Sequence, residues 1–397
     1  MVTAERVAET MSELYQRLHR RPELGLHLPE TVAAISEALS GLPLELHRGR
    51  TLDSLVAVLR GPEGGPVTVL RADTDALPIS EAADHDPRSE VEGAMHACGH
   101  DAHAAMLVGA AHLLAAEADR LPGPVVFAWQ PGEEGHDGMG AMLSEGLMEL
   151  VTSLGARART FGLHVLSDPG VPTGVFTGRP GASHASTGTF DVVFRGRGGH
   201  AAFPHLALDP LPALADFVTV LSGAAARSHD PFEPEVLTTG TITAGTAPNV
   251  IAGEAAASGT FRAYSAESAA RLGALVRRVA EGAAQAHGVD ASVELHDGYP
   301  PVVNDPECVT RFAAVVERTL GPGRFRPMAH PLPAGDDYGR LLERIPGAFF
   351  MLGGGIPDAD GVLPPNHSPD VRLDQSVFID GAAVLAAVVL EPEEESE

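Results

Sequence analysis

The sequence has few cysteines and few basic residues, and each shortage excludes a class of protein. Only two of the 397 residues are cysteine, Cys98 and Cys308, so the fold does not depend on a disulfide framework. Lys and Arg number 27 against 53 Asp and Glu, which gives a formal net charge of -26. That charge would repel nucleic acids and anionic membranes. An anionic substrate would therefore need a dedicated cation beside it.

The sequence also lacks a long apolar run. Residues 1–21 carry acids and bases throughout and contain no apolar segment typical of a signal peptide. No other stretch is long enough to cross a bilayer. We therefore expect a soluble, cytoplasmic protein. With 397 residues, 44% of them hydrophobic, the chain can form two domains with a substantial core.

Residues 1–182 alternate amphipathic helices with short apolar strands. This alternation predicts an α/β domain with a largely parallel sheet. Residues 183–298 change the pattern to strand, helix, two strands, helix and strand, which predicts an inserted ferredoxin-like domain with an antiparallel sheet. The first pattern returns in residues 299–397, which we assign to the first domain. The predicted elements lie at residues 3–19, 31–39, 55–59, 67–70, 124–129, 160–166, 189–194, 210–226, 236–242, 254–262, 268–287, 292–295, 306–320, 348–352 and 375–390.

Acidic pairs follow two of the predicted strands. Asp73 and Asp75 come after the strand at 67–70, and Glu133 and Glu134 come after the strand at 124–129. Open α/β sheets place their sites at the carboxyl ends of strands. Adjacent carboxylates are costly unless a positive charge lies near them, and a metal ion would supply it. The alternatives are a solvated turn for the first pair and a helix start that favours acids for the second.

Cys98 and His100 lie two residues apart in a loop that enters an apolar helix, close to Asp101 and His103. This spacing can direct a thiolate and an imidazole at one point, and a helix N-terminus beside a cation favours the thiolate. The alternative is a buried cysteine with incidental histidines. His164, in a predicted strand, and His367, before the last helix, are further candidates. This mixed set does not match a structural zinc finger but suits two divalent ions that share a ligand, about 3.5–4 Å apart.

Five motifs together resemble one family. They occur in family order over nearly the whole chain and are similar to those of the aminoacylase/carboxypeptidase-type dinuclear metallo-amidohydrolases. That family includes hippurate hydrolases, auxin–amino-acid conjugate hydrolases and N-acetyldiaminopimelate deacetylases. The motifs are Arg71–Pro78 (RADTDALP), Met95–His103 (MHACGHDAH), Gln130–Glu134 (QPGEE), Gly198–Ala202 (GGHAA) and Asn366–Pro369 (NHSP).

The resemblance implies a fold and a set of roles. It implies a catalytic domain with helices on both faces of its sheet, and an inserted lid and dimerisation domain. Glu133 matches the general base, which takes a proton from metal-activated water and passes it to the leaving amine. Asp75 matches a residue that supports the metal ligands, and the role of Asp73 stays open. The implied ligands of two divalent ions per subunit are Cys98, as the bridge, and His100, Glu134, His164 and His367.

The resemblance also implies roles inside the inserted domain. His200 matches a histidine that reaches a neighbouring subunit's site and stabilises the tetrahedral oxyanion. Asn249 and Arg262 match residues that hold the substrate carboxylate, a task that suits the planar fork of arginine. From the residues alone, His200 would be a turn residue beside glycines and Arg262 an exposed strand end.

Two segments depart from the family pattern. Residues 334–338 read Ala-Gly-Asp-Asp-Tyr where the family has Gly-Ala-Glu-Asp-Phe, so Asp336 is shorter and Tyr338 adds a hydroxyl. Residues 81–92 are strongly charged where the family often carries aromatic residues. Both segments are candidates for shaping the acyl pocket.

The function that follows is metal-dependent hydrolysis of the amide bond of an N-acyl amino acid. The alternatives are a metallo-dipeptidase or aminopeptidase, for which no acid that would hold a substrate amine can be assigned, and a non-catalytic protein that keeps the fold. The ligand types accept Zn, Mn, Co or Ni. The expected partners are a small amide substrate and a second copy of the chain in a homodimer or dimer-based oligomer.

Overall fold

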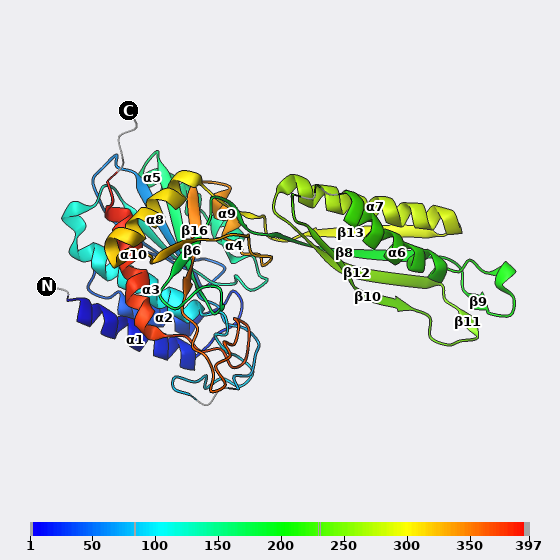
Figure 1. Cartoon of the computed structure of the whole chain (residues 1–397), viewed down its shortest axis with the longest axis horizontal. Coiled ribbons are helices and arrows are strands. Elements are labelled where there is room, and N and C mark those ends of the chain that lie inside the picture. The colour runs from blue at the N-terminus through cyan, green and yellow to red at the C-terminus, as the bar shows by residue number, and fades with distance from the viewer. Residues whose placement is uncertain (1–2, 83–84, 229, 231, 393–397) are drawn as a thin grey trace. The chain divides into compact units, whose positions relative to one another are not determined.

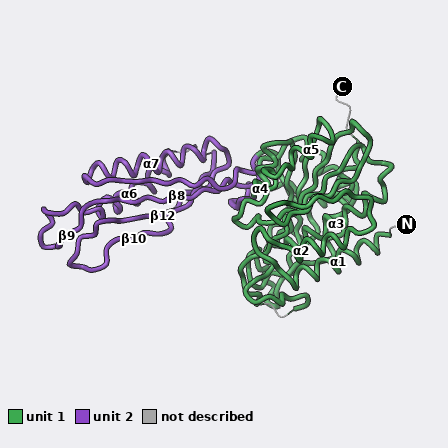
Figure 2. The backbone as a smooth tube through the Cα atoms, turned by 180° about the vertical axis from the view of Figure 1, so that it is seen from behind, with its two compact units in different colours: residues 1–181, 303–330, 337–397 green, residues 182–302, 331–336 purple. Residues whose placement is uncertain are grey.

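The computed structural model describes residues 3–82, 85–228, 230 and 232–392, and the chain divides into two compact units (Figure 2). Unit 1 comprises Met1–Gly181, Val303–His330 and Asp337–Glu397, and unit 2 comprises Ala182–Val302 and Pro331–Asp336. The sequence placed residues 331–336 in the first domain. They belong to unit 2, where backbone hydrogen bonds hold them. The N–H of Leu332 donates to the Ser183 carbonyl at 2.8 Å, and the N–H of Ala185 donates to the Ala334 carbonyl at 3.0 Å.

Unit 1 is built on an eight-stranded sheet whose four central strands are parallel. The apolar runs of the sequence form its centre, and every residue of β3 is buried. The two strands at one edge, and β6 next to β16, pair antiparallel. In order across the sheet the strands are β1 (Leu44–Arg48), β2 (Leu55–Leu59), β4 (Val125–Gln130), β3 (Val67–Asp73), β5 (Ala158–Leu166), β16 (Gly347–Gly353), β6 (Phe176–Gly178) and β15 (Phe325–Pro327).

Helices cover both faces of this sheet (Figure 1). One group packs its apolar stripes with the strands into a single large core: α1 (Ala4–Arg20), α2 (Pro29–Ala38), α3 (His100–Ala116), α8 (Pro306–Leu320) and α10 (Phe378–Leu390). Helices α4 (Gly138–Ser144) and α5 (Leu147–Leu154) contact β4 and β3 without joining that core, and α9 (Gly339–Leu342) contacts α4. Single 3₁₀ turns occur at Ala118–Arg120, Pro204–Leu206 and Gln375–Val377.

The helix starts follow from ordinary capping chemistry. The Thr3 hydroxyl accepts a hydrogen bond from the backbone N–H of Arg6 at the start of α1. At the start of α8 the Asp305 carboxylate accepts a hydrogen bond from the backbone N–H of Cys308, and Pro306 occupies the first turn. Helix α3 starts differently, because its N-cap is Gly99 in the left-handed region (φ 90°). This conformation favours glycine between Cys98 and the helix, and a Cβ atom there would also lie 2.7 Å from Leu373 Cδ1.

Unit 2 has the predicted split order and forms a four-stranded antiparallel sheet, β10-β12-β8-β13. Two helices, α6 (Leu211–Ser228) and α7 (Ala266–His287), pack together with the sheet in a second core. A small hairpin-like pair, β9 (Gly199–His200) and β11 (Val250–Ile251), completes the unit. Its main strands are β8 (Ser186–Arg195), β10 (Val236–Ala244), β12 (Glu254–Ala263) and β13 (Asp290–Asp297).

The predicted fold class, an α/β unit with a mostly parallel sheet plus a ferredoxin-like α+β unit, is confirmed. The sequence missed short elements: β1, β6, β15, α4, α5, α9, and the strands β7 (Gly181–His184) and β14 (Val302–Asn304), which pair in a two-stranded sheet. The missed strands and helices are too short to show a clear period, and β1 (LELHR), unlike the equally short β2 (LVAVL), is not an unbroken apolar run. None of the helices in the described ranges has both the length and the apolar character that crossing a membrane requires.

Candidate metal centre

The carboxyl ends of β3, β4 and β5 bring the predicted acids and histidines of unit 1 together. Asp73 ends β3, Asp75 follows it, Glu133 and Glu134 follow β4, and His164 lies near the end of β5. Because these three strands are parallel neighbours, their carboxyl ends meet at one edge of the sheet. Helix α3 begins at the same edge with His100, and Cys98 lies in the loop just before its N-cap, Gly99.

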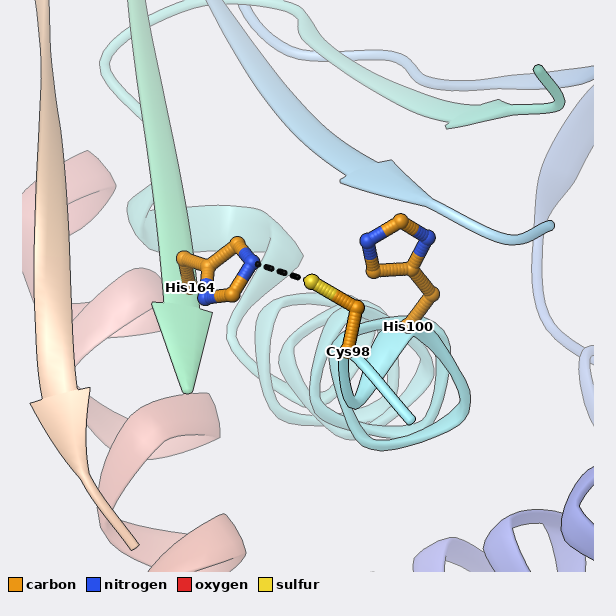
Figure 3. A group of neighbouring side chains, drawn as sticks. All are labelled: Cys98, His100 and His164. Atoms are coloured by element: carbon orange, nitrogen blue, oxygen red, sulfur yellow. Dashed lines mark hydrogen bonds between the residues drawn. The ribbon is translucent and has the colours of Figure 1, made fainter. Parts of the chain in front are cut away.

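Cys98 lies at the middle of this group. Its Sγ atom is 3.3 Å from His164 Nε2 and 3.3 Å from His367 Nε2. Figure 3 shows the sulfur between the imidazoles of His100 and His164. Two sets of convergent donors therefore share Cys98: one with His100 and His164, the other with Glu134 and His367. Glu134 Oε1 lies 3.1 Å from His367 Nε2 in the second set.

Glu133 and Glu134 are held by Asp75. The two oxygens of the Asp75 carboxylate accept the backbone N–H groups of Glu133 and Glu134, at 2.9 and 3.0 Å. Asp75 Oδ1 also lies 3.5 Å from His100 Nδ1. The Glu133 side chain joins the same set of donors as His100 and Glu134. The buried Asp75 carboxylate thus fixes the backbone of Glu133 and Glu134 and also lies beside Nδ1 of the His100 ring.

Histidine orientation comes from the backbone around the cluster. The Nδ1–H of His164 donates to the Val165 carbonyl at 2.8 Å, which leaves Nε2 as the donor atom toward Cys98. His367 has a left-handed backbone (φ 68°), a conformation that non-glycine residues adopt when surrounding contacts impose it. The backbone N–H of His367 donates to the Ala97 carbonyl. The side-chain amide of the neighbouring Asn366 donates to the carbonyls of Cys98 and Val165.

Asp73 belongs to a buried network behind the donors. Its Oδ1 accepts from His103 Nδ1 at 2.5 Å, and its Oδ2 accepts from Arg71 at 2.8 Å. His103 Nε2 in turn accepts the backbone N–H of Val165 at 2.7 Å, so the hydrogen bonds assign its tautomer. Burial opposes ionisation of Asp73, but Arg71 and the histidines outweigh it and hold its pKa well below the usual range.

The same network reaches Asp337. Its carboxylate accepts from Arg71 at 2.9 Å, from the Gln130 amide and from the backbone N–H of Met139. Tyr338 is buried and its hydroxyl bonds with Thr160 Oγ1 at 2.8 Å. The hydroxyl by which Tyr338 differs from the family's Phe therefore lies in the core of unit 1, and a role of residues 334–338 in shaping an acyl pocket stays a prediction. Asp336 is buried in unit 2.

Burial works against the expected thiolate at Cys98, which stays a prediction for the metal-bound site. Burial raises the pKa of Cys98 to about 12, and the neighbouring His100 only partly opposes this effect. Burial disfavours protonated His100, yet Asp73, Cys98 and Asp75 outweigh it and raise its pKa well above the ordinary value. Desolvation thus opposes the thiolate, which the double charge of a bound divalent ion would favour.

The donor set fits divalent metal ions. Both ring nitrogens of His100 are buried and make no hydrogen bond of ordinary length with the residues described. A zinc ion bound to sulfur at about 2.3 Å and nitrogen at about 2.0 Å, in tetrahedral geometry, would separate those atoms by roughly 3.6 Å. The observed Sγ–Nε2 distances of 3.3 Å are close to that value. Half of the His367 side chain is exposed, which leaves this side of the cluster open to solvent.

The three candidate residues of unit 2 lie at opposite ends of its sheet. His200 is exposed on β9, opposite Val250 of β11, and Asn249 accepts a backbone hydrogen bond from Ala201. Glu254, the first residue of β12, lies at that end, whereas Arg262 lies eight residue steps along the strand, roughly 27 Å away at about 3.4 Å per step. Arg262 is half-buried, and burial lowers its pKa.

Sequence reasoning named His103 as metal-capable and left the role of Asp337 open, and it assigned no positioning role to His103, Asn366 or Asp337. His103 and Asn366 stand inside recognised motifs, so their place was visible but their partners were not. Asp101, which stands beside His100 and was a metal-capable candidate, is directed elsewhere: it accepts from His19 Nδ1 at 2.7 Å. Glu81, in the charged segment, lies close to both His19 and His85, at 3.2 and 3.3 Å.

Comparison with known proteins gives consistent matches. A profile described as peptidase family M20/M25/M40 matches residues 69–391. Thermostable carboxypeptidase 2 of Saccharolobus solfataricus is 32% identical over 97% of this chain and 95% of its own length. IAA-amino acid hydrolase ILR1-like 2 of Arabidopsis thaliana is 33% identical, over 97% of this chain and 85% of its own length. N-acetylcysteine deacetylase of Bacillus subtilis is 33% identical, over 94% and 95%.

Two solved structures extend the similarity to the whole fold. A putative aminohydrolase from methicillin-resistant Staphylococcus aureus superimposes with a TM-score of 0.91 at 30% identity, over 98% of this chain and 97% of the other. A protein from Bacillus subtilis, described as a dinuclear metal-binding peptidase of the M20 family, has a TM-score of 0.84 at 29% identity, over 98% of both chains.

Proposed function

The chain belongs to peptidase family M20/M25/M40 and is a metal-dependent amidohydrolase, and on that premise we propose that it hydrolyses N-acyl amino acids to a carboxylic acid and a free amino acid. The observation that carries the proposal is the position of Cys98 Sγ, 3.3 Å from histidines that belong to two different donor sets. The names of the relatives support the substrate class, since two of them describe enzymes that act on amides of amino acids.

Five residues would hold the two metal ions. In this assignment Cys98 serves both ions, and Zn, Mn, Co and Ni all accept these ligand types. When bound, divalent ions polarise the amide carbonyl and supply a water of lowered pKa. The proposed ligands are Cys98, His100, Glu134, His164 and His367.

Glu133 is the proposed general base. It lies beside the donors and does not belong to the two sets that share Cys98. Its carboxylate would accept a proton from the attacking water and return that proton to the leaving amine nitrogen. Asp75 is a positioning residue, because it holds the backbone of Glu133 and Glu134 and faces His100. A shift of the acidic pair would separate the base from its water.

His200 is the proposed oxyanion-stabilising residue, and it acts in the site of a second copy of the chain. His200 and Asn249 lie at one end of the unit 2 sheet and Arg262 at the other, so one chain cannot gather all three around one small substrate. In a dimer, Arg262 of one subunit and His200 of the other can serve the same substrate. Arg262 and Asn249 would hold the substrate carboxylate, which the net charge of -26 otherwise repels.

Hydrolysis of a substrate panel tests this function. Chelated protein is reloaded separately with Zn, Mn, Co and Ni and incubated with N-acetyl and N-benzoyl amino acids, with matched amides that lack the carboxylate, and with dipeptides. We expect metal-dependent release of free amino acid from the N-acyl amino acids, and slower release when the carboxylate is absent. Faster cleavage of dipeptides would favour the peptidase alternative. No turnover with any metal, in protein that binds two ions per chain, would refute the proposed substrate class.

A further inference from the structure

A second convergence of metal-binding side chains lies outside the Cys98 centre. His19 Nε2 is 3.2 Å from Glu81 Oε1, and His85 Nε2 is 3.3 Å from the same oxygen. These three donor atoms all lie within 4.8 Å of one another. His19 comes from the end of α1, whereas Glu81 and His85 belong to the charged segment after β3. None of the three is among the residues that surround Cys98.

The cluster is enclosed rather than a solvated face. The side chains of His19 and Glu81 are 4% and 2% exposed, and that of His85 is 17% exposed. Burial lowers the pKa of His19, but hydrogen bonds with Asp101 and Glu81 outweigh it and raise that pKa to about 10, so the cluster holds one positive charge that a metal ion would replace. Two imidazoles and a carboxylate are also a common ligand set for first-row divalent metals.

Surrounding hydrogen bonds already direct the donor atoms inward. Asp101 Oδ2 accepts from His19 Nδ1 at 2.7 Å, so Nε2 is the nitrogen presented to Glu81. A carboxylate behind a ligating histidine is the usual outer partner in metal sites, where it fixes the ring and raises its basicity. Glu81 Oε2 accepts the backbone N–H of Ser89 at 2.6 Å, so Oε1 is the oxygen that faces both histidines.

The spacing matches the size of a metal ion. With metal–ligand bonds of about 2.0–2.1 Å, two ligand atoms of a tetrahedral zinc site lie roughly 3.3 Å apart. The two nitrogen–oxygen distances measured to Glu81 Oε1 are 3.2 and 3.3 Å. An ion could therefore enter with small side-chain adjustments.

We propose that His19 Nε2, Glu81 Oε1 and His85 Nε2 bind one further first-row divalent cation, such as Zn²⁺, in a site with no ligand in common with the Cys98 centre. Three protein ligands leave a position for water, which reaches the site past the partly exposed His85 ring. The ion replaces the proton on His19 Nε2, which goes to solvent, while the other proton stays on His19 Nδ1 and is still donated to Asp101.

The ion ties three parts of unit 1 together. It links the end of α1 to the segment after β3, and through His19 and Asp101 it links both to the first turn of α3. That turn carries His100 of the Cys98 centre. The role that follows is structural: the ion fixes the segment that leads into Cys98, without contact with the substrate-binding residues proposed above.

Counting ions in matched variants tests the proposal. The full chain is chelated, reloaded with Co²⁺ and freed of excess metal, and bound cobalt per chain is measured by mass spectrometry. We expect His85→Ala to hold one ion fewer than the wild type. His47→Ala, an exposed histidine on β1, is the control and should lose none. Glu81→Gln should lose the same ion as His85→Ala, and His85→Gln, which keeps the side-chain volume, should do so if the alanine variant unfolds.

The optical spectrum separates this site from the Cys98 centre. Only the Cys98 centre has a sulfur ligand, so only it can give a thiolate-to-cobalt absorption. That absorption should be unchanged in His85→Ala while one histidine- and carboxylate-bound ion disappears. Equal cobalt contents in the wild type and His85→Ala would overturn the proposal, and so would loss of the ion together with the thiolate absorption. Absence of that absorption in the wild type would count against the Cys98 centre and not against this site.

Discussion

The two units present their functional side chains in opposite ways. In unit 1, the donors around Cys98 are mostly buried, and hydrogen bonds fix the direction of some of them, such as the bond from His164 Nδ1–H to the Val165 carbonyl. In unit 2, His200 and Asn249 are exposed on a small pair of strands. A large apolar side chain of the same region, Phe203, is 53% exposed. Unit 1 is thus pre-organised within one chain, whereas unit 2 offers groups that need another surface to enclose them.

Dielectric environment is the physical difference between these arrangements. Buried charges at the Cys98 centre interact strongly, and metal ions must balance them. An exposed imidazole such as His200 stabilises an oxyanion weakly in water, and it becomes effective when a site excludes water around it. Substituting a site residue of unit 1 should therefore change metal binding or catalysis in the site of the same chain. Substituting His200 in unit 2 should change catalysis in the site of the partner chain.

Glu133→Gln should have the largest effect. It keeps the shape of the side chain and removes the proton acceptor, so kcat should fall by about 10⁴-fold, at the upper end for a general base. Bound metal, counted by mass spectrometry, should stay at the wild-type value because Glu133 is not one of the proposed ligands. Glu149→Gln, on α5, is the control. Retained turnover in Glu133→Gln would exclude this residue as the base.

His200→Ala should lower kcat by roughly 10²–10³-fold, the usual result of removing one oxyanion donor, with little loss of metal. The sharper measurement mixes this variant with Glu133→Gln under conditions in which subunits exchange. A mixed dimer then holds one site with an intact Glu133 and the partner's intact histidine, so activity should return. Mixtures that exchange subunits and stay inactive would show that His200 acts within its own chain or not at all.

Asp75→Asn should weaken metal binding by about 10–100-fold, the typical effect of losing an outer partner of the ligands. The amide has one oxygen where the carboxylate uses two to hold Glu133 and Glu134. Competition with a chelator of known affinity measures the change, and Asp290→Asn, at an exposed strand start in unit 2, provides the control. Equal metal affinity in Asp75→Asn and the wild type would contradict the positioning role.

The smallest effect concerns the stability of unit 2. Burial lowers the pKa of His184 from 6.5 to about 4, so folding favours its neutral form. This stability is fully present above pH 6.5 and is lost as the pH falls toward 4. Between pH 7 and 5 the loss should be about 2 kcal/mol. The free energy of unfolding, measured with denaturant on metal-free protein at both pH values, should show this loss in the wild type and not in His184→Gln. Identical pH dependence in the two proteins would contradict the prediction.

The sequence alone determined the position of the elements that have a clear apolar run or a regular spacing of apolar residues. Strand 55–59 and helix 306–320 have the predicted bounds, because an apolar run or stripe flanked by turn and capping residues defines them locally. The order of strands and helices in residues 183–298 likewise determined the ferredoxin-like class. The motifs singled out the candidate donors, because Cys, His and Glu at strand ends have few other reasons to gather there.

Only the tertiary structure decided which donors meet. His100 and Asp101 are neighbours in sequence, yet one faces Cys98 and the other faces His19, because successive helical residues point about 100° apart. Long-range contacts also decided that the Cys98 thiol is buried, which raises its pKa to about 12. The burial of Cys98 and the meeting of His19, Glu81 and His85 both depend on segments from distant parts of the chain that pack together. The local sequence around each residue does not determine which segments pack together.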